Sequence, residues 1–291
     1  MSKPVSRSSS PPKASKPAPD PMAALTLKGL GLRVGLPLLG FWIVAIVIGR
    51  AWAFAGMAVV TLAAAALVLW AIRFATKTRA VADIVKAADT PQARKEALSK
   101  LETDFKKGDT AAIFAKAQLQ LHEDPRVALQ TLEQIDLAKV MAPIADEARA
   151  QRAMIHLMLG EAERARQLVD NIDLSRHQQA KTRATLVTVI GEAWARTGQG
   201  KKALDTLSVF DPEDPEFGDL KAQLYRALAF SYAAVNDTKG IRKALRKMLE
   251  INPQLLGGFL VKKVHPLLER EAKEMLKRSG AVPKKMVVKR M

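Results

Sequence analysis

The chain has 291 residues, no cysteine and a formal net charge of +17, from 46 Lys and Arg against 29 Asp and Glu. The lack of cysteine excludes a disulfide framework and thiolate chemistry. Most of the excess charge lies at the two ends: residues 1–80 hold ten Lys or Arg against the single acid Asp20, and residues 273–291 hold seven against Glu274. The middle is nearly neutral, which argues against a nucleic-acid-binding domain, because such a domain carries its basic stripe on the folded body.

The first segment, residues 1–30, is predicted to be a disordered leader rich in Pro, Ser and Lys. Its opening 22 residues contain several prolines and too few apolar residues to bury a core. Two interpretations remain open, a solvated tail and a polyproline II ligand for a proline-recognising domain.

A nearly uninterrupted apolar run follows and predicts a transmembrane helical hairpin over residues 31–74. The two spans are expected at about 34–49 and 51–72, with Arg50 as the single charge between them. A bilayer core about 30 Å thick needs about 20 apolar residues in a helix, and the second span has that length by itself. Lys and Arg flank the hairpin on both outer sides, so both termini are expected in the cytoplasm. The protein is therefore expected to cross a membrane twice, and the expected location is a bacterial inner (cell) membrane.

Other interpretations of this run fit it less well. A signal peptide begins its apolar core nearer the start of the chain, whereas about thirty residues come first here. A buried hairpin of a soluble protein would have a shorter second helix, and a single long span would place Arg50 at mid-depth at a cost of about 2.5–3.5 kcal/mol. Gly31 and Gly35 serve either close packing of the two spans or dimerisation.

From residue 75 onward the pattern is helical, because Ala, Leu, Glu, Lys and Arg dominate and Gly and Pro cluster only at intervals. Thr90 and Pro91 form an N-cap and N1 pair at a helix start. The predicted segments in chain order are a linker and N-terminal helix (75–108), four helical repeats (109–262), an amphipathic capping helix (263–280) and a basic tail (281–291).

The repeats emerge when the chain is compared with itself. In residues 187–215, Ile190-Gly191 precedes Trp194, Gly198, Ala203, Leu207, Phe210 and Pro215. A forward shift of 38 residues gives Leu228-Ala229, Tyr232, Asn236, Ile241, Leu245 and Pro253, and weaker matches occur in the other direction. Small residues such as Gly191 allow two helices to approach, and Gly160, Gly198 and Asn236 can take the left-handed conformation that ends a helix. The repeat boundaries are predicted at about 109–145, 146–183, 184–221 and 222–262.

These spacings resemble the tetratricopeptide repeat (TPR), with a generic α-solenoid as the alternative. The resemblance implies an all-α fold in which two transmembrane helices precede a TPR-like solenoid of stacked helix pairs. It also implies a concave groove lined by the first helix of each pair. By this resemblance, the partner-binding residues are Thr188, Glu192, Arg196, Gln223, Arg226 and Phe230.

Two departures limit what the resemblance carries. Glu192 and Phe230 stand where the chaperone-type clamp for a C-terminal carboxylate has asparagines, so that ligand class is not expected. The layout of a membrane hairpin followed by repeats is similar to the HemY family, which is linked to haem biogenesis in bacteria. The turn between the spans is much shorter here, and no haem role is carried over.

No catalytic, cofactor-binding or metal-binding residues are predicted. The four histidines are scattered without ligand spacing, and no phosphate-binding glycine loop or nucleophile elbow occurs. The acidic run at 211–219 lacks the glycine and the terminal glutamate of a calcium loop, so it is predicted to be a solvated linker.

The sequence therefore predicts a non-catalytic, membrane-anchored scaffold or adaptor that binds a protein or peptide partner on the cytoplasmic side. The hairpin would contact the lipid bilayer, and the basic tail is either a solvated terminus or a contact to anionic lipid. Nucleic acid is not an expected partner. The alternative function is a membrane-shaping or membrane-tethering protein that self-associates. The basic residues of the tail at 281–291 are Lys284, Lys285, Lys289 and Arg290.

Overall fold

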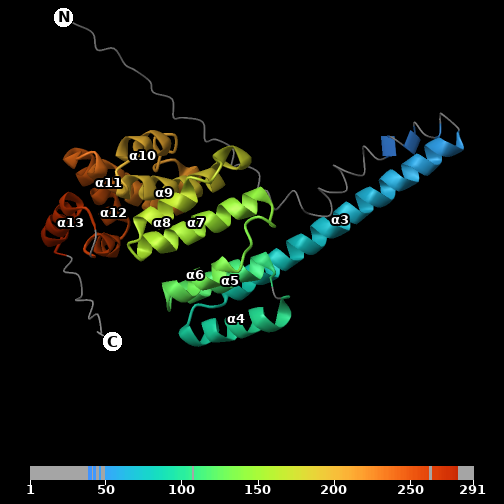
Figure 1. The fold of residues 1–291 in the computed structure, drawn as a ribbon, viewed down its shortest axis with the longest axis horizontal. Helices are drawn as coiled ribbons and strands as arrows, with labels where there is room; N and C mark the ends of the chain where they lie inside the picture. The colour runs from blue at the N-terminus through green and yellow to red at the C-terminus, as the bar shows by residue number, and fades with distance from the viewer. Residues whose placement is uncertain are drawn as a thin grey trace, which may run out of the picture. The chain divides into compact units, whose positions relative to one another are not determined.

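The computed structural model describes residues 39–40, 42–43, 46, 50–106, 108–261 and 264–280, and all regular structure in these ranges is helical (Figure 1). The predicted all-α class is therefore confirmed for this part of the chain. The predicted leader and basic tail lie outside the described residues. The chain divides into two compact units, Met1–Asp83 and Ile84–Met291.

The described part of the first unit contains most of the long helix α3, Ala51–Lys86, and before it helical residues at 39–40, 42–43 and 46. The indole Nε1 of Trp42 donates a hydrogen bond to Thr61 Oγ1 at 3.1 Å. The Trp42 ring also lies 6.4 Å from that of Phe54, centroid to centroid. Trp42 therefore packs against α3.

The prediction of two transmembrane helices is wrong. Within the ranges that the structure describes, no helix combines the length and apolar composition that a bilayer crossing requires. Helix α3 also differs from the predicted second span in its bounds: it does not stop at Ile72 but continues into charged sequence that includes Asp83 and Lys86. The predicted first span, 34–49, lies largely outside the described residues. The predicted membrane location, with both termini in the cytoplasm, is corrected together with the spans.

The second unit is built from α-helices that pair along the chain, with short 3-10 helices in three of the connections. Helix α5 packs on α6, α7 on α8, α9 on α10 and α11 on α12, and the first helices α7, α9 and α11 also pack on one another in sequence. In chain order the elements are α4 (Pro91–Asp104), α5 (Thr110–Leu121), α6 (Pro125–Glu133), α7 (Ala142–Met158), α8 (Ala162–Val169), η3 (Leu174–Arg176), α9 (Ala180–Arg196), α10 (Gly200–Leu207), η4 (Pro215–Leu220), α11 (Lys221–Ala234), α12 (Thr238–Ile251), η5 (Pro253–Phe259) and α13 (Pro266–Arg278).

Local sequence explains where the pairs turn. Gly160, Gly198 and Asn236 have φ values of 76°, 86° and 58°, so each takes the left-handed conformation expected of it. Thr90 caps α4, with its side chain accepting a hydrogen bond from the Ala93 amide. These turns fold each second helix back onto the first.

The helices of a pair approach closely at small residues. A Cβ atom at Gly191 would lie 2.8 Å from Leu207 Cδ1, and Leu207 is itself fully buried. The largest apolar cluster joins α11, α12, η5 and α13 and includes Leu245, Phe259 and Leu268, none of which is exposed. This cluster holds η5, which follows α12, against α11. The contact helps to form one side of the candidate groove. The identification of the stacked pairs as a tetratricopeptide-like solenoid stays a prediction.

Candidate ligand-binding groove

The six predicted groove residues lie on two neighbouring helices. Thr188, Glu192 and Arg196 lie on α9, and Gln223, Arg226 and Phe230 lie on α11, which packs directly against α9. Spacings of three and four residues place each trio along one helix face. The sequence pattern thus places the two trios on packed helices, and the side-chain contacts decide which of the six act together.

Four of the six form one contact network. The Glu192 carboxylate accepts hydrogen bonds from Arg226 Nε at 2.8 Å and Nη2 at 3.0 Å, a two-point pairing between α11 and α9. The same carboxylate accepts one from Arg196 Nη1 at 3.0 Å. The guanidinium carbons of Arg196 and Arg226 lie 5.0 and 5.4 Å from the centre of the Phe230 ring, in cation–π geometry. The structure therefore brings Glu192, Arg196, Arg226 and Phe230 together.

This network is largely shielded from water. The side chains of Glu192 and Arg196 are 9% and 10% exposed, and that of Arg226 is 33% exposed. Burial acts to lower the pKa of Arg226, but the neighbouring Glu192 carboxylate outweighs it, so the pKa is raised above its ordinary value. Arg196 Nη1 also donates to the Leu157 carbonyl at 2.9 Å, near the end of α7. Three successive first helices thus share one charged cluster.

Two adjoining cavities open beside this cluster, with volumes of about 250 and 400 Å³. Both are lined by Arg196 and Phe230, and Arg226 lines the larger one. The rest of the larger wall is apolar or glycine and comes from the end of α7 with the turn after it, and from η5 with two valines that follow it. These remaining residues are Leu157, Met158, Leu159, Gly160, Gly258, Val261 and Val264.

The other two predicted residues do not join the site. Thr188 is buried, and its hydroxyl donates to the Thr185 carbonyl at 2.7 Å within its own helix. Gln223, with its amide oriented to satisfy both atoms, donates to the carbonyls of Asp219 and Leu220. Neither lines the cavities. In both side chains the donor group is already bonded to backbone carbonyls of the same helix or of the residues just before it.

The wall supplied by Gly258, Val261 and Val264 was not predicted from the sequence. Phe259 is fully buried, with its ring 5.4 Å from that of Phe230 and 5.8 Å from the Arg226 guanidinium carbon. Gly258 borders the same guanidinium, because a Cβ atom there would lie 3.1 Å from Arg226 Nη1. The signal that could have found this wall is the apolar sequence around Gly257-Gly258, which comes after Pro253, the last matched position of the predicted repeat 222–262.

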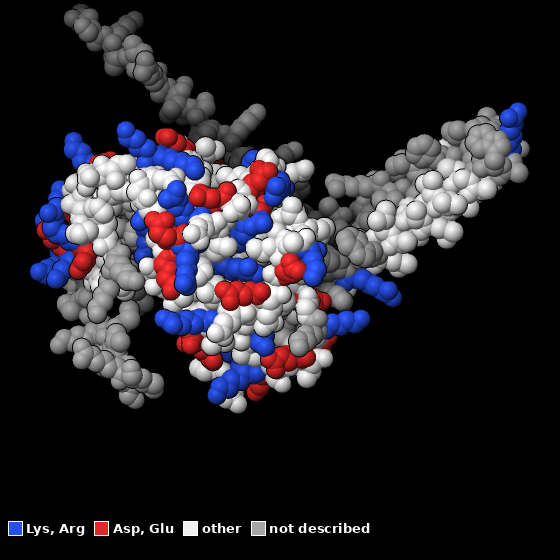
Figure 2. Space-filling view, viewed as in Figure 1, with Lys and Arg blue, Asp and Glu red and all other residues white. Residues whose placement is uncertain are grey.

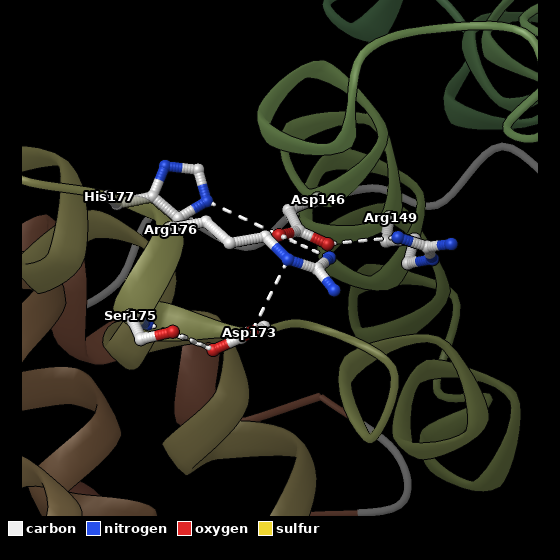
Figure 3. A network of polar contacts seen from close by, with 6 residues as sticks. All are labelled: Asp146, Arg149, Asp173, Ser175, Arg176 and His177. Atoms are coloured by element: carbon white, nitrogen blue, oxygen red, sulfur yellow. Dashed lines mark hydrogen bonds and ion pairs between the residues drawn. The ribbon is translucent and has the colours of Figure 1, made fainter.

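A second polar cluster surrounds the fully buried Asp146 of α7 (Figure 3). Its carboxylate lies 2.9 Å from Arg149 Nη1, 3.5 Å from Arg176 Nη1 and 3.4 Å from His177 Nε2. Ser175 bonds instead to Asp173 at 2.7 Å, so serine, histidine and aspartate do not form a nucleophilic relay. The contacts attach the connection between α8 and α9 to the first turns of α7, which is a structural role.

A third cluster centres on Glu213, in the connection between α10 and α11. The carboxylate accepts from Lys221 at 2.7 Å and Tyr225 at 2.6 Å and lies 3.1 Å from Lys247. The hydrogen bond from Lys221 and then those from Tyr225 and Lys247 lower the pKa of Glu213 to about 2. A cavity of about 590 Å³ adjoins it, lined from α11 by Tyr225, Leu228 and Tyr232.

Other acidic side chains of the linker at 211–219 also make local contacts. Asp211 and Asp214 accept hydrogen bonds from the amides of Glu213 and Glu216, as turn and helix caps do. In the described ranges, no group of three or more His, Asp and Glu side chains is placed to hold a metal ion. On the face shown in Figure 2, acidic and basic side chains are interspersed over the second unit.

Comparison with known proteins gives no relative: no family model matches the chain, and neither a curated protein nor a solved structure matches it.

Proposed function

We propose that this protein is a non-catalytic adaptor of helix pairs that binds an extended segment of another protein in the groove beside Arg196, Arg226 and Phe230. The observation that carries the proposal is the 400 Å³ cavity, which combines an apolar wall with two guanidinium groups held in fixed positions. Sites that bind small ligand groups have this composition, mostly apolar with a few placed polar groups.

The rigidity of the polar groups supports a binding role. Glu192 holds Arg226 at two points, and the Leu157 carbonyl holds Arg196. Side chains that are already ordered lose little conformational entropy when a ligand arrives. Met158 supplies the contrasting element: it is 53% exposed and lines the cavity, and a flexible thioether adapts to different apolar groups.

Selection from a random-peptide display library on the full-length protein tests the proposal. Met158→Glu places a charge at the exposed rim of the cavity, and Met141→Glu is its matched control, because Met141 is 58% exposed at the opposite end of α7 and does not line either cavity. We expect peptides that are enriched on the wild type and on Met141→Glu and that Met158→Glu fails to retain. Peptides retained equally by all three proteins, or no enrichment at all, would overturn the proposal.

One observation favours self-association as a second candidate function. Val59, Leu62, Ala66 and Leu69 recur along α3 at the alternating three- and four-residue spacing of a coiled-coil seam. Val59, Leu62 and Leu69 are 66%, 71% and 61% exposed. A second copy of α3 offers the same apolar stripe, so the surface is complementary to itself.

Sedimentation velocity of the full-length protein tests this candidate. We expect Leu62→Gln to shift the protein toward monomer, whereas Val60→Gln, at a 51% exposed position off the stripe, leaves the distribution unchanged. A wild-type protein that sediments as a monomer at all concentrations would exclude it.

A further inference from the structure

We infer that the groove recognises a segment in which an acidic residue directly adjoins a large apolar residue, with the carboxylate bound at the guanidinium edges of Arg196 and Arg226. This inference rests on the proposed function and adds the chemistry of the ligand. It is carried by the charge balance of the cluster, by the donors that its internal contacts leave unused, and by the apolar wall beside them.

The charge balance favours an anion. Two guanidinium groups share the single carboxylate of Glu192, so the cluster keeps one net positive charge. Arg196 and Arg226 both line the larger cavity, while Glu192 does not. No Asp or Glu is among the residues that line either of the two cavities. A ligand that enters therefore meets positive charge in a setting with little water to screen it.

The unused donors point to a carboxylate rather than to a diffuse anion. Arg226 pairs with Glu192 through Nε and Nη2, and Arg196 makes its contacts through Nη1. Within the described contacts, Arg226 Nη1 and Arg196 Nη2 have no hydrogen-bond partner. The ring of Phe230 packs against both guanidinium groups, so a ligand is offered their in-plane edges. In-plane N–H groups are the donors that planar carboxylates match best.

The apolar wall lies next to these edges. Met158 and Val261 are half-exposed and Val264 is buried, and all three line the same cavity as the two arginines. A volume of about 400 Å³ is near the lower end of ligand pockets, which suits one or two side chains rather than a large cofactor. The carboxylate and the apolar group must therefore be close together in the ligand, as they are in adjacent residues of a peptide.

The chain's own termini do not fit this description. Residues 281–291 contain Lys284, Lys285, Lys289 and Arg290 and no acidic residue, and residues 1–30 contain Asp20 as the single acid among several Lys and Arg. Basic segments are repelled by an arginine pair with a net positive charge. The occupant is therefore an acidic and apolar segment of another protein.

The test uses bead-bound decapeptide pools that are acetylated and amidated at their ends, so that no terminal charge contributes. Each pool has a fixed central pair, Asp-Phe, Asn-Phe, Asp-Ser or Lys-Phe, between four randomised uncharged residues on either side. The concentration of labelled full-length protein that half-saturates each pool is measured. We expect the Asp-Phe pool to bind about tenfold or more tightly than the Asn-Phe and Asp-Ser pools, and the Lys-Phe pool to bind most weakly.

Two variants locate the effect. Arg196→Gln is expected to lower the affinity for the Asp-Phe pool to that for the Asn-Phe pool. Arg242→Gln is the control and should keep the preference for Asp-Phe, because it removes the same charge from an arginine that pairs with Glu271 and does not line the cavities. Gly258→Ala keeps every charge but crowds Arg226 Nη1, so it should weaken the Asp-Phe pool more than the Asn-Phe pool. Thermal melting confirms that each variant is folded.

The outcomes separate this inference from the proposed function. Equal binding of the Asp-Phe and Asn-Phe pools, tighter binding of the Lys-Phe pool, no binding of any pool, or an Asp preference that survives Arg196→Gln would each overturn the inference. The proposed function would still stand if display-selected peptides were lost on Met158→Glu, and it would fall with the inference if they were not.

Discussion

The carboxylate of Glu192 and the guanidinium of Arg226 form a two-point ion pair between α9 and α11, with N–O distances of 2.8 and 3.0 Å across 34 residues of sequence. The pair joins successive first helices on the groove side, and Arg196 extends it to the end of α7. The same contacts that hold the helices in register also fix the two guanidinium edges at the cavity. The stability of the helix contact is therefore coupled to the position of the two guanidinium groups.

Glu192→Gln tests that coupling. The substitution leaves two largely shielded arginines without a counter-charge, so we expect the free energy of unfolding to fall by about 1–3 kcal/mol. Urea denaturation followed by circular dichroism measures the loss. Glu102→Gln is the control, because Glu102 is 60% exposed in its ion pair with Lys116 and should change stability by less than about 0.5 kcal/mol. Equal effects of the two substitutions would contradict the coupling.

Asp146→Asn should loosen the connection between α8 and α9. Asp146 is fully buried, and Arg149, Arg176 and His177 all lie within 3.5 Å of its carboxylate. The neutral amide can accept fewer charge-assisted hydrogen bonds, so we expect a loss of about 1–3 kcal/mol in the free energy of unfolding. Amide hydrogen exchange should become faster over residues 171–179.

The control for this substitution is Asp136→Asn, at a half-exposed carboxylate that pairs with Lys139 on the surface. It should leave exchange over 171–179 as in the wild type. Unchanged protection of that segment in Asp146→Asn would show that the buried carboxylate does not attach the connection.

Gly200→Ala should destabilise the junction between α10 and α11. The added methyl carbon would lie 2.7 Å from Ala234 Cβ and 3.2 Å from the Ala234 carbonyl carbon, and a backbone atom cannot move aside alone. Overpacking of this kind costs about 1–3 kcal/mol. Gly218→Ala, where no atom lies within 4 Å of the added carbon, should change the melting temperature little. A melting temperature for Gly200→Ala as high as that of the wild type would show that the junction has space.

The Glu213 cluster predicts a defined acid sensitivity. The folded-state pKa of Glu213 is about 2, against an ordinary value of 4.5, mainly because Lys221, Tyr225 and Lys247 stabilise the carboxylate. For a carboxyl group with a depressed pKa, the stabilisation is complete above pH 4.5 and is lost as the pH falls toward 2. Glu213→Gln should therefore melt at a lower temperature than the wild type at pH 7, and the difference should shrink between pH 4.5 and pH 2.

Melting temperatures across that pH range measure the effect. Glu96→Gln, at an exposed glutamate of α4, provides the comparison. A difference between Glu213→Gln and the wild type that stays constant from pH 7 to pH 2 would contradict the assignment.

Local patterns predicted the helical part of the fold well. The turn positions Gly160, Gly198 and Asn236 and the cap at Thr90 could be read from the sequence because they depend on the backbone preferences of single residues. Among the predicted groove residues, Glu192, Arg196, Arg226 and Phe230 meet in one network because helical spacing places them on neighbouring faces, and their role in binding stays a prediction.

The remainder depended on contacts that no local pattern encodes. Thr188 and Gln223 share the helical spacing, but their side-chain donors bond to backbone carbonyls three or four residues earlier in the chain. The wall formed by Gly258, Val261 and Val264 lies beyond Pro253, the last matched repeat position, so its position follows from the burial of Phe259 rather than from sequence phase. The predicted spans rested on hydropathy alone, and the continuation of α3 to Lys86 was not visible in it.

Photo-cross-linking from the rim of the cavity tests the central claim most directly. A benzoyl-phenylalanine at position 158, compared with one at position 141, would be irradiated in the full-length protein together with a display-selected peptide. A groove that binds an extended segment predicts a covalent peptide adduct from position 158 and none from position 141. Adducts of equal yield from both positions, or from neither while the peptide remains bound, would contradict the claim.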